Sequence, residues 1–205
     1  MNKTLHTYGD SHAIHYGGWN KIKIDNLNIL TNHLPGKLMY SFGRDMIDVV
    51  NNVKDGDMIC FCFGEIDCRC HIHKYKSNWS SVIDDVVKNY FICIRKNINK
   101  FQNLKVFVFN VVPQLERELP QNAWIEAGNG LPTLGTDEDR KKYTLYMNSK
   151  LKEYCEEYKY VFFNVYDKYA DERGYLRMEL SDRNCHISNS IYMQEFLVNY
   201  LNQTL

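Results

Sequence analysis

Three short stretches of this chain are apolar at nearly every position, and they span residues 58–63, 106–112 and 160–165. They are rich in β-branched and aromatic residues. Strands that helices cover on both faces need apolar side chains in both directions, so each stretch predicts a buried strand of a parallel sheet. Residues 3–8 and 38–40 add two further strand candidates, which makes five in all.

Between and after these strands, apolar residues recur at the spacing of a helix face. Ser80 or Ser81 can cap the first long helix, Thr136 the second and Ser188 the last. A short helix is also predicted over residues 46–53. Strands that alternate with helices predict a mostly parallel sheet with right-handed crossovers, and therefore an α/β fold in the form of a three-layer α/β/α sandwich.

Length and charge narrow the class of protein. At 205 residues and 44% hydrophobic composition, the chain is expected to fold as one domain over residues 1–205. Lys plus Arg equal Asp plus Glu at 25 each, so no net field favours a nucleic acid or membrane partner. The N-terminus lacks a secretory signal, and seven cysteines indicate reduced thiols, which together predict a cytoplasmic protein.

Polar, glycine-containing clusters follow the predicted strands. In an open parallel sheet they gather at one edge, where such sheets bind ligands. Ser11, after the first strand, is a candidate nucleophile; His186, near the end of the chain, is its candidate base; and Asp182 can fix the imidazole tautomer. Backbone N–H groups of Ser11 and Gly43 are the candidate oxyanion donors. This chemistry requires no cofactor and no metal.

Four ordered blocks carry a family resemblance: Gly9-Asp10-Ser11, then Gly43, then Gly64-Glu65-Ile66-Asp67, and last the stretch from Asp182 to His186. Together they resemble the SGNH hydrolase superfamily, also called GDSL esterases. The resemblance implies a flavodoxin-like, five-stranded sheet and a catalytic serine in the first block. It also implies a histidine in the last block preceded by its aspartate, and activity on acyl esters of lipids, carbohydrates or small alcohols.

Two departures from the family pattern matter. Ile66 stands where the family usually has an oxyanion-donating asparagine, and the third block is closer to the Gly-Glu-x-Asp variant of some carbohydrate esterases. Three residues rather than two separate Asp182 from His186, so either Asp182 or a backbone carbonyl orients the imidazole. Arg69 and His71 are the nearest substitutes for the missing donor, and the candidate substrate-binding residues are Glu65, Arg69, His71 and Trp124.

Other interpretations use the same residues. The segment from Cys68 to His73 offers thiols and imidazoles for zinc, but it lacks the two-residue spacing of zinc knuckles, while Cys60 and Cys62 fit a buried strand. Residues 114–135 form a long loop that can act as a lid, with Trp124 available to stack on a sugar ring.

The sequence therefore predicts a serine esterase that acts on a small or carbohydrate O-acyl ester, with O-acetyl as the expected acyl group. Its partner is then a small-molecule or carbohydrate substrate, and the sequence leaves the oligomeric state open. An O-acyltransferase acting on a sugar and a non-catalytic carbohydrate-binding descendant of the same fold are the alternatives.

Overall fold

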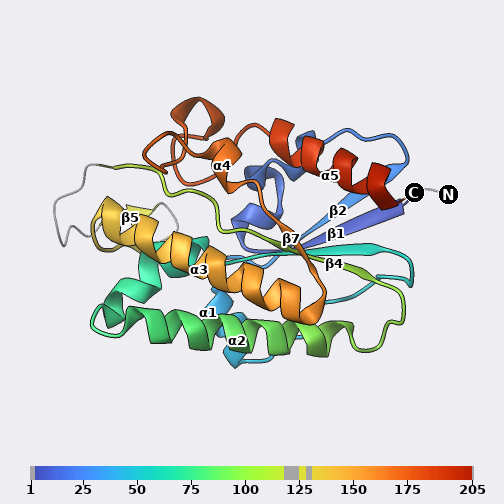
Figure 1. Cartoon of the computed structure of the whole chain (residues 1–205), viewed down its shortest axis with the longest axis horizontal. Helices are drawn as coiled ribbons and strands as arrows, with labels where there is room; N and C mark the ends of the chain where they lie inside the picture. The colour runs from blue at the N-terminus through green and yellow to red at the C-terminus, as the bar shows by residue number, and fades with distance from the viewer. Residues whose placement is uncertain (1–2, 118–124, 128–130, 205) are drawn as a thin grey trace.

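A five-stranded parallel sheet forms the centre of the computed structural model, which describes residues 3–117, 125–127 and 131–204. The strand order is β2-β1-β3-β4-β7, and every neighbouring pair runs parallel (Figure 1). The strands are β1 (Lys3–Gly9), β2 (Leu27–His33), β3 (Met58–Cys62), β4 (Lys105–Phe109) and β7 (Val161–Phe163). This order is the flavodoxin-like one, so the sequence prediction of the fold is confirmed.

Helices cover both faces of the sheet (Figure 1). On one face lie α1 (Met39–Arg44), α2 (Trp79–Ile98) and α3 (Asp137–Tyr158), and on the other lie α5 (Ile191–Thr204) and the three short 3-10 turns η1 (Ser11–Ala13), η2 (His15–Gly17) and η3 (Trp19–Lys21). Each side has its own buried cluster, with Phe61 and Tyr90 in one and Trp19 and Leu197 in the other. The molecule is therefore a three-layer α/β/α sandwich.

The second strand is where the sequence prediction was wrong. Residues 38–40 are the N-cap and the first two residues of α1, while β2 occupies Leu27–His33. Strand β2 lies at the edge of the sheet and is only half covered, with Leu30 45% exposed. An edge strand does not need apolar side chains on both faces, so it lacks the continuous apolar pattern that marks the inner strands.

Of the three helix N-caps predicted from the sequence, the structure has one, at Thr136. Thr136 caps α3 in a capping box, because its hydroxyl accepts the Asp139 N–H while the Asp139 carboxylate accepts the Thr136 N–H. Helix α2 begins at Trp79, ahead of the predicted serine caps, and α5 begins at Ile191, whose N–H bonds to the Asn189 side chain. The helix predicted over residues 46–53 does not form.

Within residues 114–135, where a long loop was predicted, β5 (Ile125–Ala127) pairs antiparallel with β6 (Leu131–Thr133). The remaining short elements are α4 (Tyr166–Tyr169), η4 (Asp67–His71), η5 (Ile72–Tyr75) and η6 (Met178–Leu180). Helix η4 is a π-helical turn that begins at Asp67, shortly after β3 ends at Cys62, and such turns occur frequently at functional sites.

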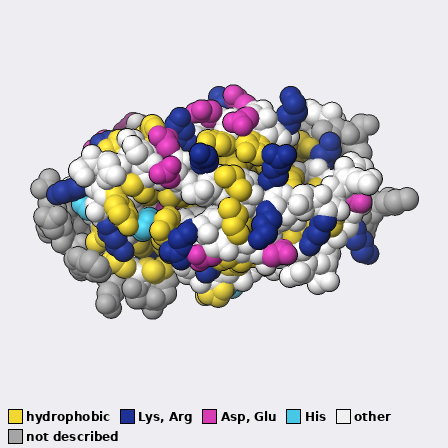
Figure 2. All heavy atoms as spheres, turned by 90° about the horizontal axis from the view of Figure 1, so that it is seen from below, with side chains coloured by type: hydrophobic (Ala, Val, Ile, Leu, Met, Phe, Trp, Pro, Cys, Tyr) yellow, Lys and Arg dark blue, Asp and Glu magenta, His cyan; other side chains and the backbone are white. Residues whose placement is uncertain are grey.

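Two observations on the described residues bear on a membrane or nucleic acid partner. Across the described residues, every helix is too short or too polar to cross a bilayer. Basic and acidic side chains both occur on the face seen in Figure 2, interspersed with apolar ones. The absence of a nucleic acid partner and the cytoplasmic location stay predictions.

Candidate active site

The register of the sheet brings three loops together. Gly9 at the end of β1 is opposite His33 of β2 and Cys62 of β3, so the residues that follow each strand emerge at the same level. Strand order reverses between β1 and β3, and this switch point is where doubly wound sheets bind ligands. Ser11 follows β1, Gly36 follows β2 and Ile66 follows β3. All three line one cavity of about 570 Å³.

Ser11 and His186 lie within hydrogen-bond distance across this cavity, although 175 positions separate them in the chain. The Ser11 Oγ is 2.8 Å from the His186 Nε2, and the Asp182 Oδ2 is 2.6 Å from the His186 Nδ1. A carboxylate can only accept, so Nδ1 carries the proton and Nε2 is left to accept the serine proton. The three sequence-predicted residues thus have the arrangement of a nucleophile, a base and a group that fixes the tautomer.

The three-residue spacing between Asp182 and His186 is accommodated by a tight loop. The Asp182 N–H donates to the His186 carbonyl at 3.0 Å, and the Asp182 Oδ1 accepts the His186 N–H at 3.0 Å. Arg183 takes a positive φ of 63° within this loop. Asp182, rather than a backbone carbonyl, is therefore the group that contacts the imidazole.

The surroundings of His186 keep it uncharged. Burial, followed by the positive charge of His12, lowers the pKa of His186 below its ordinary 6.5, and the hydrogen bond to Asp182 opposes this only in part. The pKa of Asp182 is also lowered: burial alone would raise it, but its hydrogen bonds from His186 and Asn184 outweigh that effect. A neutral imidazole beside an ionised carboxylate is the state that a general base needs.

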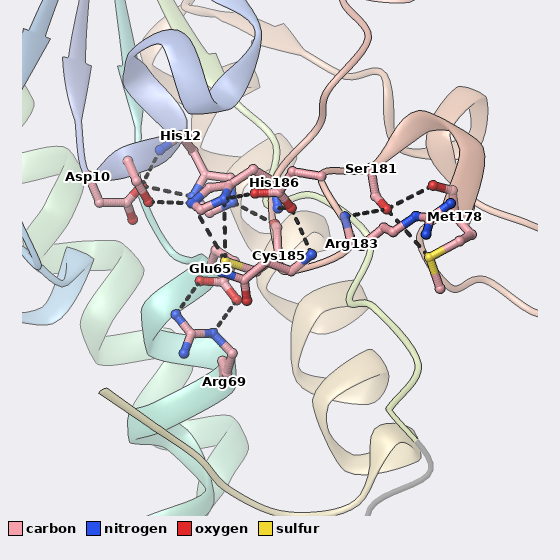
Figure 3. Close-up of polar contacts among 12 residues, drawn as sticks. Asp10, His12, Glu65, Arg69, Met178, Ser181, Arg183, Cys185 and His186 are labelled. Carbon is pink, nitrogen blue, oxygen red and sulfur yellow. Dashed lines mark hydrogen bonds and ion pairs between the residues drawn. The ribbon is translucent and has the colours of Figure 1, made fainter. Parts of the chain in front are cut away.

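Four buried charged side chains lie next to His186, and Figure 3 shows them in one group. Asp10 accepts from His12 Nδ1 at 2.9 Å, and Glu65 pairs with Arg69 through two bonds of 2.6 and 3.1 Å. Each of the four is at most 4% exposed. Burial would raise the pKa of Glu65, but the charge and hydrogen bonds of Arg69 hold it below its ordinary value, so Glu65 is ionised.

Gly43 does not belong to this site, which corrects the sequence prediction. It lies inside α1, where a Cβ would come within 2.8 Å of the backbone of Asn89 and Tyr90 in α2. Its lack of a side chain allows the two helices to pack closely. The prediction failed because the second strand was assigned to residues 38–40, which made Gly43 appear to follow it.

Gly36, and not Gly43, is the glycine that follows the second strand of the sheet. It follows β2, lines the cavity with Ser11, and sits in a turn closed by the Lys37 N–H donating to the Leu34 carbonyl at 3.1 Å. Pro35 precedes it, and its φ of 61° is the positive value that a type II turn needs at this position. The Pro-Gly pair was a turn signal in the sequence that could have located it.

The predicted substrate-binding residues have different positions. Arg69 lines the cavity, whereas Glu65 does not and instead holds the Arg69 guanidinium. His71 stacks on Tyr40 with ring centroids 4.6 Å apart and does not line the cavity, which argues against a direct contact with substrate. Trp124 lies outside the described residues. Leu131, at the start of β6, also lines the cavity, and the lid stays a prediction.

Ile66 turns an apolar side chain to the cavity at the position where an oxyanion-donating amide was expected. The following residue, Asp67, is structural: its carboxylate accepts the N–H groups of Met39 and Tyr40 at 2.6 and 3.0 Å and so holds the start of α1. Burial raises the pKa of Asp67 to about 7.

In the described part of the chain, one group of potential metal ligands lies close enough together to bind an ion, and it consists of His12, Cys185 and His186. The donors suit a metal poorly. Both ring nitrogens of His12 already bond to acceptors, and burial raises the pKa of the Cys185 thiol far above its ordinary value. Cys68, which the sequence offered as a zinc ligand, belongs to no such group among the described residues. Its thiol contacts the Met147 sulfur in the core instead.

No family model and no curated protein matches this sequence. Solved structures do match over nearly the whole chain. A candidate acylhydrolase from Bacteroides fragilis has a TM-score of 0.66 at 15% identity, covering 98% of this chain and 88% of that one. A GDSL-like lipase from Bacteroides thetaiotaomicron has a TM-score of 0.65 at 14% identity, covering 100% and 90%.

An aryl esterase from M. smegmatis has a TM-score of 0.56 at 11% identity and covers 98% of each chain. At such low identities these similarities show the fold alone: the chain shares the fold of these structures. They do not by themselves assign a substrate or a residue role.

Proposed function

We propose that this chain, which has the SGNH hydrolase fold, is a serine hydrolase of carboxylic esters. The observation that carries the proposal is the 2.8 Å contact between Ser11 Oγ and His186 Nε2, with Asp182 bonded to the other ring nitrogen. These three groups meet at the ligand-binding edge of the sheet and line a cavity open to a substrate. The geometry of the group, and not the fold alone, supports hydrolase chemistry.

In the proposed mechanism, Ser11 attacks the ester carbonyl while His186 accepts the hydroxyl proton and then returns it to the leaving alcohol. Water, activated by the same imidazole, then releases the acid from the acyl-enzyme. The backbone N–H groups of Ser11 and Gly36 are the proposed oxyanion donors. Arg69 is the cavity's cationic donor beside Ile66 and is the proposed substitute for the missing amide.

The test compares Ser11→Ala with the parent protein on p-nitrophenyl acetate. We expect kcat to fall by roughly 10³-fold or more, because the nucleophile is lost. Ser149→Ala is the matched control, since that hydroxyl lies on the exposed side of α3 and bonds only its own helix at Tyr146. Equal rates for Ser11→Ala and the parent would remove Ser11 from the mechanism.

A fluorophosphonate probe separates the hydrolase from a non-catalytic binding protein. An activated serine is phosphonylated at Ser11, and the adduct is located by mass spectrometry. A parent protein that takes up no probe would favour the binding protein. Adding an acceptor alcohol to the ester assay, and measuring the transferred acyl group, distinguishes hydrolysis from acyl transfer.

For the substrate we propose an ester of a short acyl group, with acetyl as the preferred acyl group and a carbohydrate hydroxyl as the preferred alcohol. Ile66, Leu131 and Cys185 give the cavity a small apolar part, and the half-exposed Tyr16 stands at its rim with a flat ring for a sugar face. We expect a higher kcat/KM on an acetylated oligosaccharide than on a p-nitrophenyl ester of a long fatty acid. The reverse order would favour a lipid substrate.

A further inference from the structure

His12 is the residue next to the proposed nucleophile, and its imidazole is buried. It is 4% exposed. Its Nδ1 lies 2.9 Å from the Asp10 carboxylate, and its Nε2 lies 3.0 Å from the backbone carbonyl of Cys185. The Cys185 carbonyl can only accept, so Nε2 donates to it, while Nδ1 lies against Asp10 Oδ1, which also accepts the His12 N–H. A doubly protonated, positively charged imidazole satisfies both ring contacts.

The same contacts join two parts of the active site that are far apart in sequence. Asp10 belongs to the turn that carries Ser11, and Cys185 immediately precedes His186. The His12 ring also lies beside the His186 ring, with centroids 4.8 Å apart (Figure 3). A cation at this distance disfavours a second positive charge on His186.

We propose that His12 is a positioning residue of the active site: a buried cation that ties the His186 loop to the Ser11 turn and keeps the His186 imidazole neutral. The inference rests on the proposed function, because it concerns the base of that reaction. No step of the mechanism requires His12 to touch the substrate.

The charged groups around the two rings support this role. His12 is faced by Asp10 from its own turn and by Glu65 from the segment after β3, and its ring lies beside that of His186. Burial alone would lower the pKa of His12, but Asp10, then Glu65 and the Cys185 carbonyl, raise it to about 9. His12 is therefore charged at neutral pH.

His186 is faced by Ser11, Asp182, the Cys185 thiol, Tyr16 and His12, with Glu65 nearby. The carboxylates of Asp182 and Glu65 both favour a charged His186. Arg69 pairs with Glu65 through two hydrogen bonds. That pairing reduces the pull of Glu65 on His186. The positive charge of His12 then opposes Asp182.

The test is His12→Gln, which keeps an amide donor for the Cys185 carbonyl and removes the charge. We expect the acid limb of the pH profile of kcat/KM to move up by roughly one pH unit, because the like charge beside His186 is gone. A residue that acts only in folding would lower the rate without moving this limb. His12→Ala loses the tie as well, so its kcat is expected to be lower than that of His12→Gln.

His6→Gln is the matched control. His6 is equally buried in β1 and also bonds a carboxylate, at 3.2 Å on Asp57, but it lies outside the cavity. Its acid limb is expected to coincide with that of the parent. An acid limb in His12→Gln that also coincides with the parent overturns the proposal.

A measurement on the parent protein needs neither turnover nor a stable variant. In ¹⁵N-histidine spectra at pH 8, we expect one ring with both nitrogens protonated, and we expect that signal to be absent from His12→Gln. A parent spectrum without a doubly protonated ring at pH 8 overturns the proposal even if the variant fails to fold. Failure of the hydrolase proposal itself would appear separately, as unchanged turnover in Ser11→Ala.

Discussion

Ser11 owes its proposed reactivity to what surrounds its hydroxyl. The residue is half-buried, its Oγ faces a neutral imidazole at 2.8 Å, and that imidazole is held by Asp182. A serine hydroxyl without such a base is a weak nucleophile at neutral pH. The chemistry therefore depends on side chains brought to Ser11 from the far end of the chain.

Asp182→Asn tests the third member of the group. The asparagine amide can donate to Nδ1 and so favour the wrong tautomer, which leaves Nε2 protonated and unable to accept the serine proton. We expect kcat on p-nitrophenyl acetate to fall by roughly 10²- to 10⁴-fold, with a smaller change in KM. Asp25→Asn, at an exposed position ahead of β2, is the control and should match the parent.

The pH profile of the parent protein follows from His186. The base must be neutral to accept a proton, and burial together with the charge of His12 lowers its pKa below 6.5. We therefore expect the midpoint of the acid limb of kcat/KM to lie below pH 6.5. A midpoint above 6.5 would contradict this assignment of the base.

Two glycines differ in what they contact: Gly36 lines the cavity, and Gly43 packs α1 against α2. Gly36 belongs to the turn after β2, where a positive φ is required, and Gly43 belongs to the contact between α1 and α2. The same residue type thus answers two different needs, one of backbone conformation beside the cavity and one of close helix packing.

Gly43→Ala should destabilise the protein without changing the chemistry. Its Cβ would lie 2.8 Å from backbone atoms of Asn89 and Tyr90, which is too close, so α1 must move away from α2. We expect a loss of about 1–3 kcal/mol in the free energy of unfolding, measured in urea. The kcat of the folded protein should stay near the parent value. A large loss of kcat with unchanged stability would restore Gly43 to the oxyanion site.

Gly36→Asn and Gly36→Val form a pair for the turn. Asparagine tolerates a positive φ and keeps the backbone N–H in place, whereas a β-branched residue at a φ of 61° is strained. We expect Gly36→Asn to retain most of the activity on p-nitrophenyl acetate and Gly36→Val to lose much more. Similar rates in the two variants would show that the conformation of this turn does not govern catalysis.

Over the whole molecule, buried charge near the active site links stability to pH. His12 has a pKa of about 9 in the folded protein, against 6.5 for a free histidine, so the folded state binds its proton more tightly. The stability that this gives is fully present below pH 6.5 and is lost as pH rises through about 9. We therefore expect the free energy of unfolding to decrease as the pH rises through about 9.

Urea unfolding at several pH values tests this linkage. Between pH 6.5 and 9.5 we expect the parent protein to lose roughly 2–3 kcal/mol through His12. The same loss should be absent from His12→Gln, so the difference between the two curves isolates this group from the others that titrate, Asp67 among them. Parallel curves for the two proteins over this range would contradict the assignment.

The sequence by itself determined most of the elements and the three central site residues. The inner strands were visible because burial on both faces demands continuous apolar runs, and Thr136 was visible because a helix cap is a local hydrogen bond. Ser11, Asp182 and His186 were identified from the order of the blocks that carry them, and the structure places them in contact.

Only the tertiary structure decided which residues complete the site. The edge strand β2 is half exposed and has no continuous apolar pattern, so its position, and with it the choice of Gly36 over Gly43, followed from pairing with β1. The contact of His12 with the Cys185 carbonyl joins residues 173 positions apart. Local sequence signals report a residue's own neighbours, whereas contacts between distant segments arise only when the sheet sets them at one edge.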